Sequence, residues 1–154
     1  EYTVPFLTST MTNHISTVKQ KTHTFRLTLS SSTKQIHNVE NFFLDLNTSV
    51  HLGEEKLHAL LVAITEAVNN CIIHGNKQDE AKRVTVTCNV RGHMLTVKVK
   101  DEGEGFTPDA LPNPLHEENL LRSGGRGVFL MKTLMESVRY NKKGNEVTMK
   151  MKIV

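Results

Sequence analysis

The chain has 154 residues, which is enough for one domain with a hydrophobic core, and its 38% hydrophobic and 23% charged residues are typical of a globular protein. The net charge of +3 comes without a run of Lys and Arg or interleaved aromatic residues, so it does not indicate nucleic-acid binding. The longest purely apolar run, ALLVAI, is too short to span a bilayer, and we expect no membrane partner.

The N-terminal half predicts a lead-in segment, a strand and two helices. The first 22 residues are rich in Ser and Thr without clear periodicity, and we interpret them as a flexible N-terminal segment. HTFRLTLSS alternates apolar and polar residues and predicts a strand over 23–31. Capping residues open STKQIHNVENFFLDLNTSV, which predicts a helix over 32–50. A longer helix, GEEKLHALLVAITEAVNNCIIHGN, is predicted from residue 53 and stops at Gly75.

The C-terminal half predicts a hairpin, a long loop, a helix and one or two strands. RVTVTCNVRGHMLTVKVKD holds two alternating runs around Arg91-Gly92 and is typical of a hairpin. The stretch DEGEGFTPDALPNPLHEENLLRSGGRG is rich in Gly and Pro, and such long irregular connections are usually functional or disordered. VFLMKTLMESV predicts a helix over 128–138, and RYNKKGNEVTMKMKIV closes the chain with strand alternation. This order predicts an α/β (α+β) two-layer sandwich, with a mixed, mostly antiparallel sheet and helices on one face.

The cysteines and histidines do not form the pattern of a metal site. Cys71 and Cys88 have no CxxC spacing, and the eight histidines form no Cys/His cluster. Two buried thiols in a reducing compartment are the plain interpretation. The N-terminus also lacks the charged-then-apolar pattern of a signal peptide, so we expect a cytoplasmic protein.

The long helix carries polar residues at four-residue spacing, namely Glu66, Asn70 and His74. Its apolar residues form a core stripe, and Glu66 lies roughly 200° around the helix from Ile64, on the far side. Two interpretations remain open for that side. It is either a solvated face, which is the commoner case, or a surface that lines a pocket.

A second cluster, VKDEGEGF, ends a predicted strand in Asp101, followed by Gly103 and Gly105. Glycines allow a sharp turn and a close approach to a ligand, and a carboxylate at this place can accept a hydrogen bond from an exocyclic amine. A plain Asp-Gly turn is the alternative.

A third cluster, RSGGRGVFLMKTLM, carries a glycine-rich backbone into a helix N-terminus. Free N–H groups and the positive end of the helix dipole form an anion site there, and Arg122 and Arg126 add positive charge. The cluster matches neither a Walker loop nor a Rossmann fingerprint. A flexible loop with a glycine hinge is the alternative.

The three clusters together suggest one nucleotide site. Asn70 is a neutral oxygen ligand suited to Mg²⁺, which prefers few protein ligands besides phosphate and water. Glu66, one helical turn away, is placed to orient or deprotonate a hydroxyl that attacks the γ-phosphate. In this hypothesis Asp101 recognises the base, the third cluster holds the phosphates, and the polar side of the helix faces the nucleotide.

Three motifs of this sequence resemble those of a known family. TEAVNNCIIHGN, DEGEGF and SGGRGVFLMKTLM, in this order, resemble the N-box and the two glycine boxes of the GHKL ATPase/kinase superfamily (the Bergerat fold). The resemblance covers roughly residues 23–154, and the short lid NPLHEENLLRSGGRG is similar to that of the anti-sigma factor serine-protein kinases of bacterial partner-switching systems. It implies a homodimeric serine/threonine kinase that uses ATP and Mg²⁺, binds a sigma factor and phosphorylates a small antagonist (anti-anti-sigma) protein.

The resemblance also implies roles for single residues. It makes Glu66 the general base and Asn70 the Mg²⁺ ligand, and it makes Asp101 the partner of the adenine amino group. Gly103 and Gly105 would shape the pocket. The residues that would hold the phosphates are Gly125, Arg126 and Gly127, with Arg122 nearby. His74 is taken as local structure.

This sequence departs from the family pattern in two places. Gly124 precedes the glycine pair of the second box, and Asn145 stands where the family often has a Thr that supports adenine binding. Asn145 keeps the capacity to hydrogen-bond, and we count it among the nucleotide-binding residues.

Two other functions remain open from the sequence. The first is a nucleotide-binding module that sequesters a regulator without phosphoryl transfer, against which the presence of both Glu66 and Asn70 argues. The second is a detached histidine-kinase ATPase domain, against which the short lid argues.

Overall fold

The computed structural model describes residues 20–105 and 125–154, so residues 1–19 of the predicted flexible segment and most of the predicted lid lie outside the described residues. The elements along the chain are β1 (Thr22–Ser30), a 3₁₀ turn (Thr33–Gln35), α1 (Ile36–Val50), α2 (Glu54–Asn70), a π-helical turn (Cys71–Gly75), β2 (Arg83–Arg91), β3 (Met94–Lys100), α4 (Gly125–Leu134), β4 (Ser137–Tyr140) and β5 (Glu146–Lys152).

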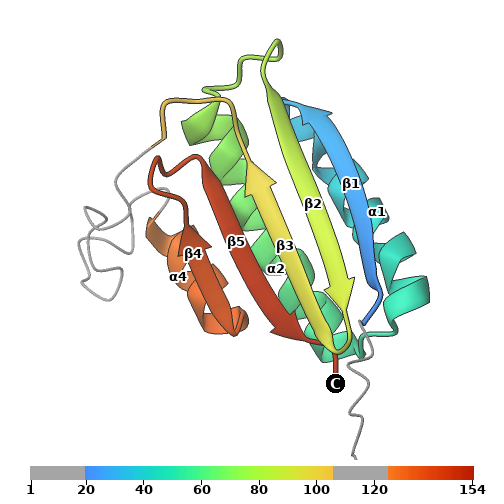
Figure 1. Ribbon diagram of the computed structural model, residues 1–154. Helices are drawn as coiled ribbons and strands as arrows, with labels where there is room; N and C mark the ends of the chain where they lie inside the picture. Colours follow the sequence, from blue (N-terminus) through green and yellow to red (C-terminus); the bar gives the residue numbers. More distant parts are fainter. Residues whose placement is uncertain (1–19, 106–124) are drawn as a thin grey trace, which may run out of the picture.

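The strands form one five-stranded sheet in the order β1-β2-β3-β5-β4. Every neighbouring pair in it is antiparallel, so the described sheet is antiparallel rather than mixed. Figure 1 shows that α1, α2 and α4 all lie behind the sheet, while its front face carries no helix. The predicted two-layer sandwich with helices on one face is confirmed.

The core lies between the sheet and the three helices, with α2 contributing the largest share of the helical residues. Each strand alternates, so that one set of side chains points toward the helices and is buried. The fully buried members include Val86, Leu95 and Val97 of the sheet and Leu60, Ile64 and Val68 of α2. The segment Glu54–Gly75 has the length and mean hydropathy (1.3) of a membrane span, but core helices of soluble proteins pass the same test.

Two helix ends differ from the sequence-based expectation. The predicted helix over 128–138 is wrong at its end, because α4 stops at Leu134 and Ser137 and Val138 belong to β4. Pairing of Val138 with Met149 of β5 places a β-branched side chain in a strand, where it packs better than on a helix. The long helix does reach Gly75, but its last turn is a π-helix, in which the N–H of Asn76 donates to the carbonyl of Cys71 at 2.7 Å.

Candidate functional site

A cavity of about 230 Å³ opens between the end of α2, the end of β3, the start of α4 and the β4–β5 turn. Its apolar walls come from Ala67, Val128 and Val147, and its polar groups include those of Asp101 and Asn145. A mostly apolar cavity with a few convergent polar groups is the usual form of a small-molecule site. The cavity therefore suits a flat, largely apolar ring that also carries a hydrogen-bonding edge.

Asp101 is the buried carboxylate of this cavity, with 5% of its surface exposed. Its backbone N–H donates to the carbonyl of Asn145 at 3.0 Å, and its Oδ1 accepts the N–H of Gly103 at 2.8 Å. Burial raises the pKa of the Asp101 carboxyl above its usual range, and hydrogen bonds from Gly103 and the Cys71 thiol oppose that rise. The side chain is thus held by few donors and keeps an acceptor oxygen for a ligand donor.

Gly75 makes the position of Asp101 possible. A Cβ on Gly75 would lie 2.3 Å from Cγ of Asp101, far inside van der Waals contact. Only a residue without a side chain lets the end of the helix approach the end of β3 this closely. Gly75, at the end of the first motif, therefore makes room for Asp101 of the second motif. Neither motif shows this contact by itself.

Asn145 fixes the backbone on which Asp101 stands. The Oδ1 of Asn141 accepts the N–H groups of Gly144, Asn145 and Glu146 at 2.8, 3.0 and 3.2 Å. This leaves Nδ2 of Asn141 to donate to Oδ1 of Asn145 at 2.7 Å, and Nδ2 of Asn145 to donate to the carbonyl of Asp101 at 3.3 Å. Asn145 lines the cavity, and its side chain braces Asp101. Asn141 was not singled out from the sequence, although an Asn that opens a Lys-Lys-Gly turn is a known turn signal.

Glu66 and Asn70 face the first turn of α4. A Cβ on Gly127 would lie 2.5 Å from Oε2 of Glu66 and 3.5 Å from Nδ2 of Asn70. Glu66 is half-buried between the two helices, beside the end of α4 where the dipole is positive. Glu66 and Asn70 are half-buried, which supports the pocket interpretation for these two residues, whereas Ile73 and His74 farther along the same side of the helix are exposed.

The other predicted phosphate-binding residues are only partly described. Gly125 and Arg126 are the first two residues of α4, and the side chain of Arg126 lies outside the described part. Arg122 and Gly124 also lie outside the described residues. Gly105 lines the cavity, and Gly103 lies beside it through its hydrogen bond to Asp101.

Cys71 and Tyr140 are cavity residues that sequence reasoning did not assign to the site. Burial and the nearby charge of Asp101 raise the pKa of the Cys71 thiol well above its usual range, so the thiol is neutral and donates to that carboxylate. Burial also raises the pKa of Tyr140. Cys71 follows Asn70 directly on the helix, and this adjacency was the signal available in the sequence.

Asn76 joins the end of the helix to three other segments. Its Nδ2 donates to Oγ of Ser31 at 2.7 Å and to the carbonyl of Arg83 at 3.0 Å, and its Oδ1 accepts the N–H of Glu102 at 2.8 Å. The residue is fully buried, so each of these groups would otherwise lack a partner. Asn76 thereby positions the loop that follows Asp101.

We expect Asn76→Ala to lower the free energy of unfolding by about 2–4 kcal/mol, because it leaves several buried polar groups unpaired. Asn89→Ala is the matched control, since its side chain makes an exposed hydrogen bond with Thr24 and its loss costs less than about 1 kcal/mol. Urea denaturation measures both changes. Equal losses in the two variants would show that the Asn76 network does not stabilise the fold.

The arrangement fits a nucleotide and a magnesium ion. The cavity offers an acceptor for a base amine, and the Glu66–Asn70 pair lies where a helix N-terminus favours anions. Within the described ranges no group of three His, Cys, Asp or Glu residues is placed to enclose a metal. A magnesium ion here would thus be bound by Asn70 together with phosphate and water oxygens, which matches its preference.

The sequence is similar to those of known proteins. Residues 29–151 match the model of the family described as histidine kinase-like ATPase domain. The chain is 34% identical over 91 residues to the serine-protein kinase RsbW of Bacillus subtilis, covering 55% of this chain and 57% of that protein. It is 30% identical over 121 residues to the anti-sigma F factor of Clostridium perfringens, covering 75% of this chain and 84% of that protein.

A solved structure shares the fold. A crystal structure of RsbU and RsbW domains from Mycobacterium tuberculosis matches with a TM-score of 0.60 at 15% identity, covering 84% of this chain and 31% of the other. The match to the Bacillus subtilis relative spans little more than half of that protein's length.

Proposed function

The chain belongs to the histidine kinase-like ATPase domain family, on the branch of the anti-sigma factor serine-protein kinases, and from this premise we propose that it is an ATP-dependent serine/threonine protein kinase that acts as an anti-sigma factor. The observation that carries the proposal is the meeting of Glu66 and Asn70 with the first turn of α4, next to the cavity of Asp101. In the proposal, Asp101 forms the base-recognition side of this site, and Glu66 and Asn70 with the start of α4 form its phosphate side.

In the proposal, Asp101 binds the adenine amino group. The carboxylate accepts from the N–H of Gly103 and from the Cys71 thiol, and because its two oxygens offer about four acceptor positions it can still accept from the base. The cavity of about 230 Å³ is smaller than the roughly 300–1,000 Å³ of a typical ligand pocket, so it takes the base while the phosphates extend toward Asn70 and α4. Gly125, Arg126 and Gly127 would hold those phosphates, with Arg122 adding charge.

Phosphoryl transfer depends mostly on positioning and charge neutralisation. Asn70 would hold Mg²⁺, which neutralises charge on the phosphates when it is bound. Glu66 would hold the serine or threonine hydroxyl of the partner in line and accept its proton as the oxygen bonds to the γ-phosphorus and ADP leaves. Within this pair, Asn70 would bind the metal ion and Glu66 would accept the proton of the hydroxyl.

The proposed protein partners are inferred from the relatives and from the family resemblance. We propose that the chain binds a sigma factor and phosphorylates a small antagonist protein. The names of the relatives give serine-protein kinase and anti-sigma F factor for those proteins, and the antagonist is what the family resemblance implies. Phosphate on the antagonist would weaken its binding through added negative charge next to Glu66. We propose further that the protein works in the cytoplasm as a homodimer, which the resemblance implies.

The proposal is tested by a transfer assay with γ-labelled ATP, Mg²⁺ and a candidate antagonist. The expected result is label on a serine or threonine of the antagonist, lost when EDTA removes the metal. Nucleotide binding without label on an antagonist that demonstrably binds would favour the sequestering module. Acid-labile label on a histidine would favour a histidine-kinase ATPase domain.

A further inference from the structure

The front face of the sheet, opposite to the helices, is built from polar side chains. Along β3 the buried Val97 and Val99 alternate with the exposed Lys98 and Lys100, and β5 shows the same alternation. We call the side chains of β1–β5 that point away from the helices the open face. Figure 1 shows it without a covering helix.

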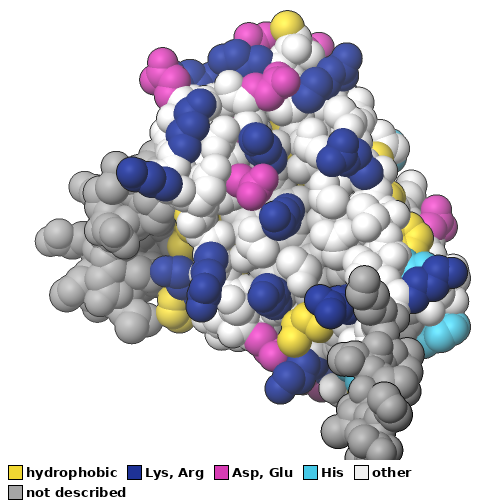
Figure 2. All heavy atoms as spheres, in the orientation of Figure 1, with side chains coloured by type: hydrophobic (Ala, Val, Ile, Leu, Met, Phe, Trp, Pro, Cys, Tyr) yellow, Lys and Arg dark blue, Asp and Glu magenta, His cyan; other side chains and the backbone are white. Residues whose placement is uncertain are grey.

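The open face is strongly cationic. Its basic residues are Arg26, Arg83, Arg91, Lys98, Lys100, Arg139, Lys150 and Lys152, whereas Glu146 is the acidic residue among the described strand positions on this side. Figure 2, in the same orientation, shows Lys and Arg spread over the strands with little hydrophobic surface between them. Most of the remaining positions on this face are Thr.

The sheet register sets the spacing of the cations. One row across all five strands runs Arg26, Thr87, Lys98, Thr148, Arg139. Neighbouring strands lie about 4.8 Å apart, so basic side chains in this row recur about every 10 Å, with a hydroxyl between them. A partner with carboxylates at a similar spacing can pair with several of them at once.

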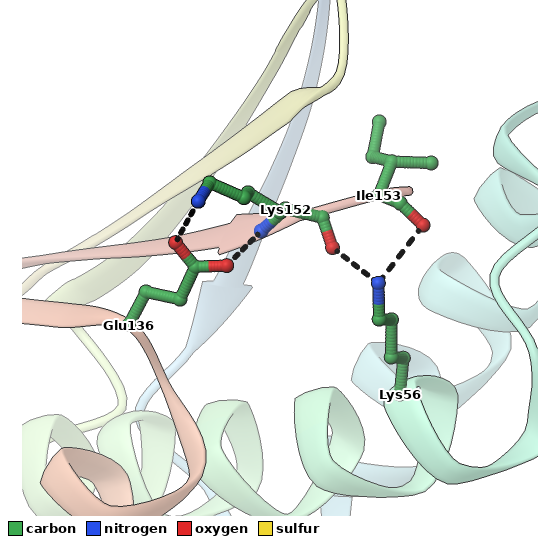
Figure 3. Close-up of polar contacts among 4 residues, drawn as sticks. All are labelled: Lys56, Glu136, Lys152 and Ile153. Carbon is green, nitrogen blue, oxygen red and sulfur yellow. Dashed lines mark hydrogen bonds and ion pairs between the residues drawn. The ribbon is translucent and has the colours of Figure 1, made fainter.

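The charge is segregated rather than spread evenly. The whole chain has 19 Lys and Arg against 16 Asp and Glu, and eight of the basic residues but one of the acidic residues stand on the open face. The rest of the chain is therefore net negative. At this face one ion pair within the described residues joins Lys152 Nζ to Glu136 Oε2, 3.9 Å apart (Figure 3).

The same close-up shows how that corner is anchored. The backbone N–H of Lys152 donates to Oε1 of Glu136 at 3.0 Å, and Nζ of Lys56 donates to the carbonyls of Lys152 and Ile153 (Figure 3). The other basic residues of the open face make no ion pair within residues 20–105 and 125–154. Unpaired like charges on one face repel each other, and a partner of opposite charge relieves that repulsion.

The open face is also hollowed. A depression of about 800 Å³ is lined by Arg91, Lys98, Arg139 and Lys150, together with threonines between them. Tyr140 and Glu146 border both this depression and the nucleotide cavity. A segment bound in the depression would therefore lie close to the cavity of Asp101, which is on the helix side of the sheet.

We propose that the open face docks an acidic, carboxylate-rich segment of a protein partner. Apart from the half-buried Met94, and Tyr140 at the border of the depression, its described strand positions hold no large apolar or aromatic group to enter a membrane or to stack on bases. Two copies packed face to face would bring like charges together. A protein with clustered Asp and Glu satisfies the Lys, Arg and Thr donors.

The size of the face predicts a transient complex. The five strands have nine, nine, seven, four and seven residues, and at about 4.8 Å between strands and about 3.3 Å per residue they cover about 570 Å². This is below the roughly 800 Å² per partner of a stable interface, so charge rather than area has to hold the complex. Binding is therefore expected to be fast and sensitive to salt.

The test uses the full chain and a fluorescent peptide of glutamate and serine residues as the acidic probe. Lys98→Glu/Lys150→Glu reverses charge in the depression, and Lys34→Glu/Lys132→Glu makes the same charge change on exposed positions of the helix side. We expect affinity to fall about tenfold or more in the first variant and to change less than about twofold in the second. Lys98→Thr/Lys150→Thr, which keeps strand-favouring residues, is expected to show an intermediate loss.

Four outcomes overturn the proposal. They are equal loss in both charge variants, tighter binding of random-sequence duplex DNA than of the peptide, tighter binding of phosphatidylserine vesicles, and a wild-type dimer that sedimentation shows to be dissociated by Lys98→Glu/Lys150→Glu. ATP binding is measured in each variant. It is expected to be unchanged, so failure of the docking proposal is distinguishable from failure of the kinase proposal.

Discussion

Asp101→Asn is expected to reduce the affinity for ATP by about 100-fold or more while the protein stays folded, because an amide N–H replaces the acceptor that we propose for the base amine. The amide oxygen can still accept the N–H of Gly103, now 2.8 Å from Oδ1, so the loop keeps its geometry. Calorimetric titration with ATP and with inosine triphosphate, which lacks the amino group, measures the effect. The wild type should prefer ATP, and the variant should lose that preference.

Asp45→Asn, an exposed change of the same type on α1, is the matched control and should leave ATP binding unchanged. A wild-type preference for ATP that persists in Asp101→Asn would show that Asp101 does not recognise the base.

Asp101→Asn is also expected to change how the stability of the protein depends on pH. Because burial raises the pKa of Asp101 in the folded protein above its unfolded value, the folded state binds more protons between the two pKa values, and this carboxyl makes the protein less stable as pH rises. Asp101→Asn removes the effect. Without nucleotide, the stability of the variant relative to the wild type should increase from about pH 4 upward, and the midpoint of thermal unfolding measures it. A constant difference across pH would contradict the raised pKa.

Glu66→Gln is expected to lower the rate of phosphoryl transfer by about 10²- to 10⁴-fold, the usual contribution of a general base. ATP affinity should remain within about threefold of the wild type, because the amide keeps the size of the side chain and does not contact the base. Single-turnover transfer of label and a separate binding titration measure the two effects. Glu55→Gln, an exposed change in the first turn of the same helix, is the control.

Gly127→Ala tests the same geometry from the other side. Its new Cβ would lie 2.5 Å from Oε2 of Glu66, and the end of a Glu side chain can move away without unfolding the protein. We expect slower transfer with an unchanged midpoint of unfolding. Transfer at the wild-type rate in both Glu66→Gln and Gly127→Ala would exclude Glu66 as the base.

The local periodicity of the sequence predicted most of the strands and helices. Alternation predicted β1, the β2–β3 hairpin and β5, and helical spacing predicted α1 and α2, because each pattern is complete within a short window. The boundary between α4 and β4 was not predictable in this way. MESV fits a helix locally, and only pairing of Val138 with β5 decides for a strand.

The candidate site was likewise predictable only in part from the sequence. The three motifs pointed to Glu66, Asn70, Asp101 and the α4 glycines as a group, and the structure brings the described ones together. The order of the motifs did not show that Gly75 makes room for Asp101, or that the Cys71 thiol donates to it. Those contacts join residues about 25 to 30 positions apart in the chain, and no local pattern encodes such a distance.

The sequence by itself therefore determined most of the segments that become strands and helices, and it predicted the residues for which we propose nucleotide chemistry. Only the tertiary structure decided how Asn76 links four segments and how basic residues from Arg26 to Lys152 gather on one face of the sheet. Local patterns follow from the backbone geometry of a few neighbouring residues. Clusters across strands follow from strand order and register, which the packing of the whole core sets.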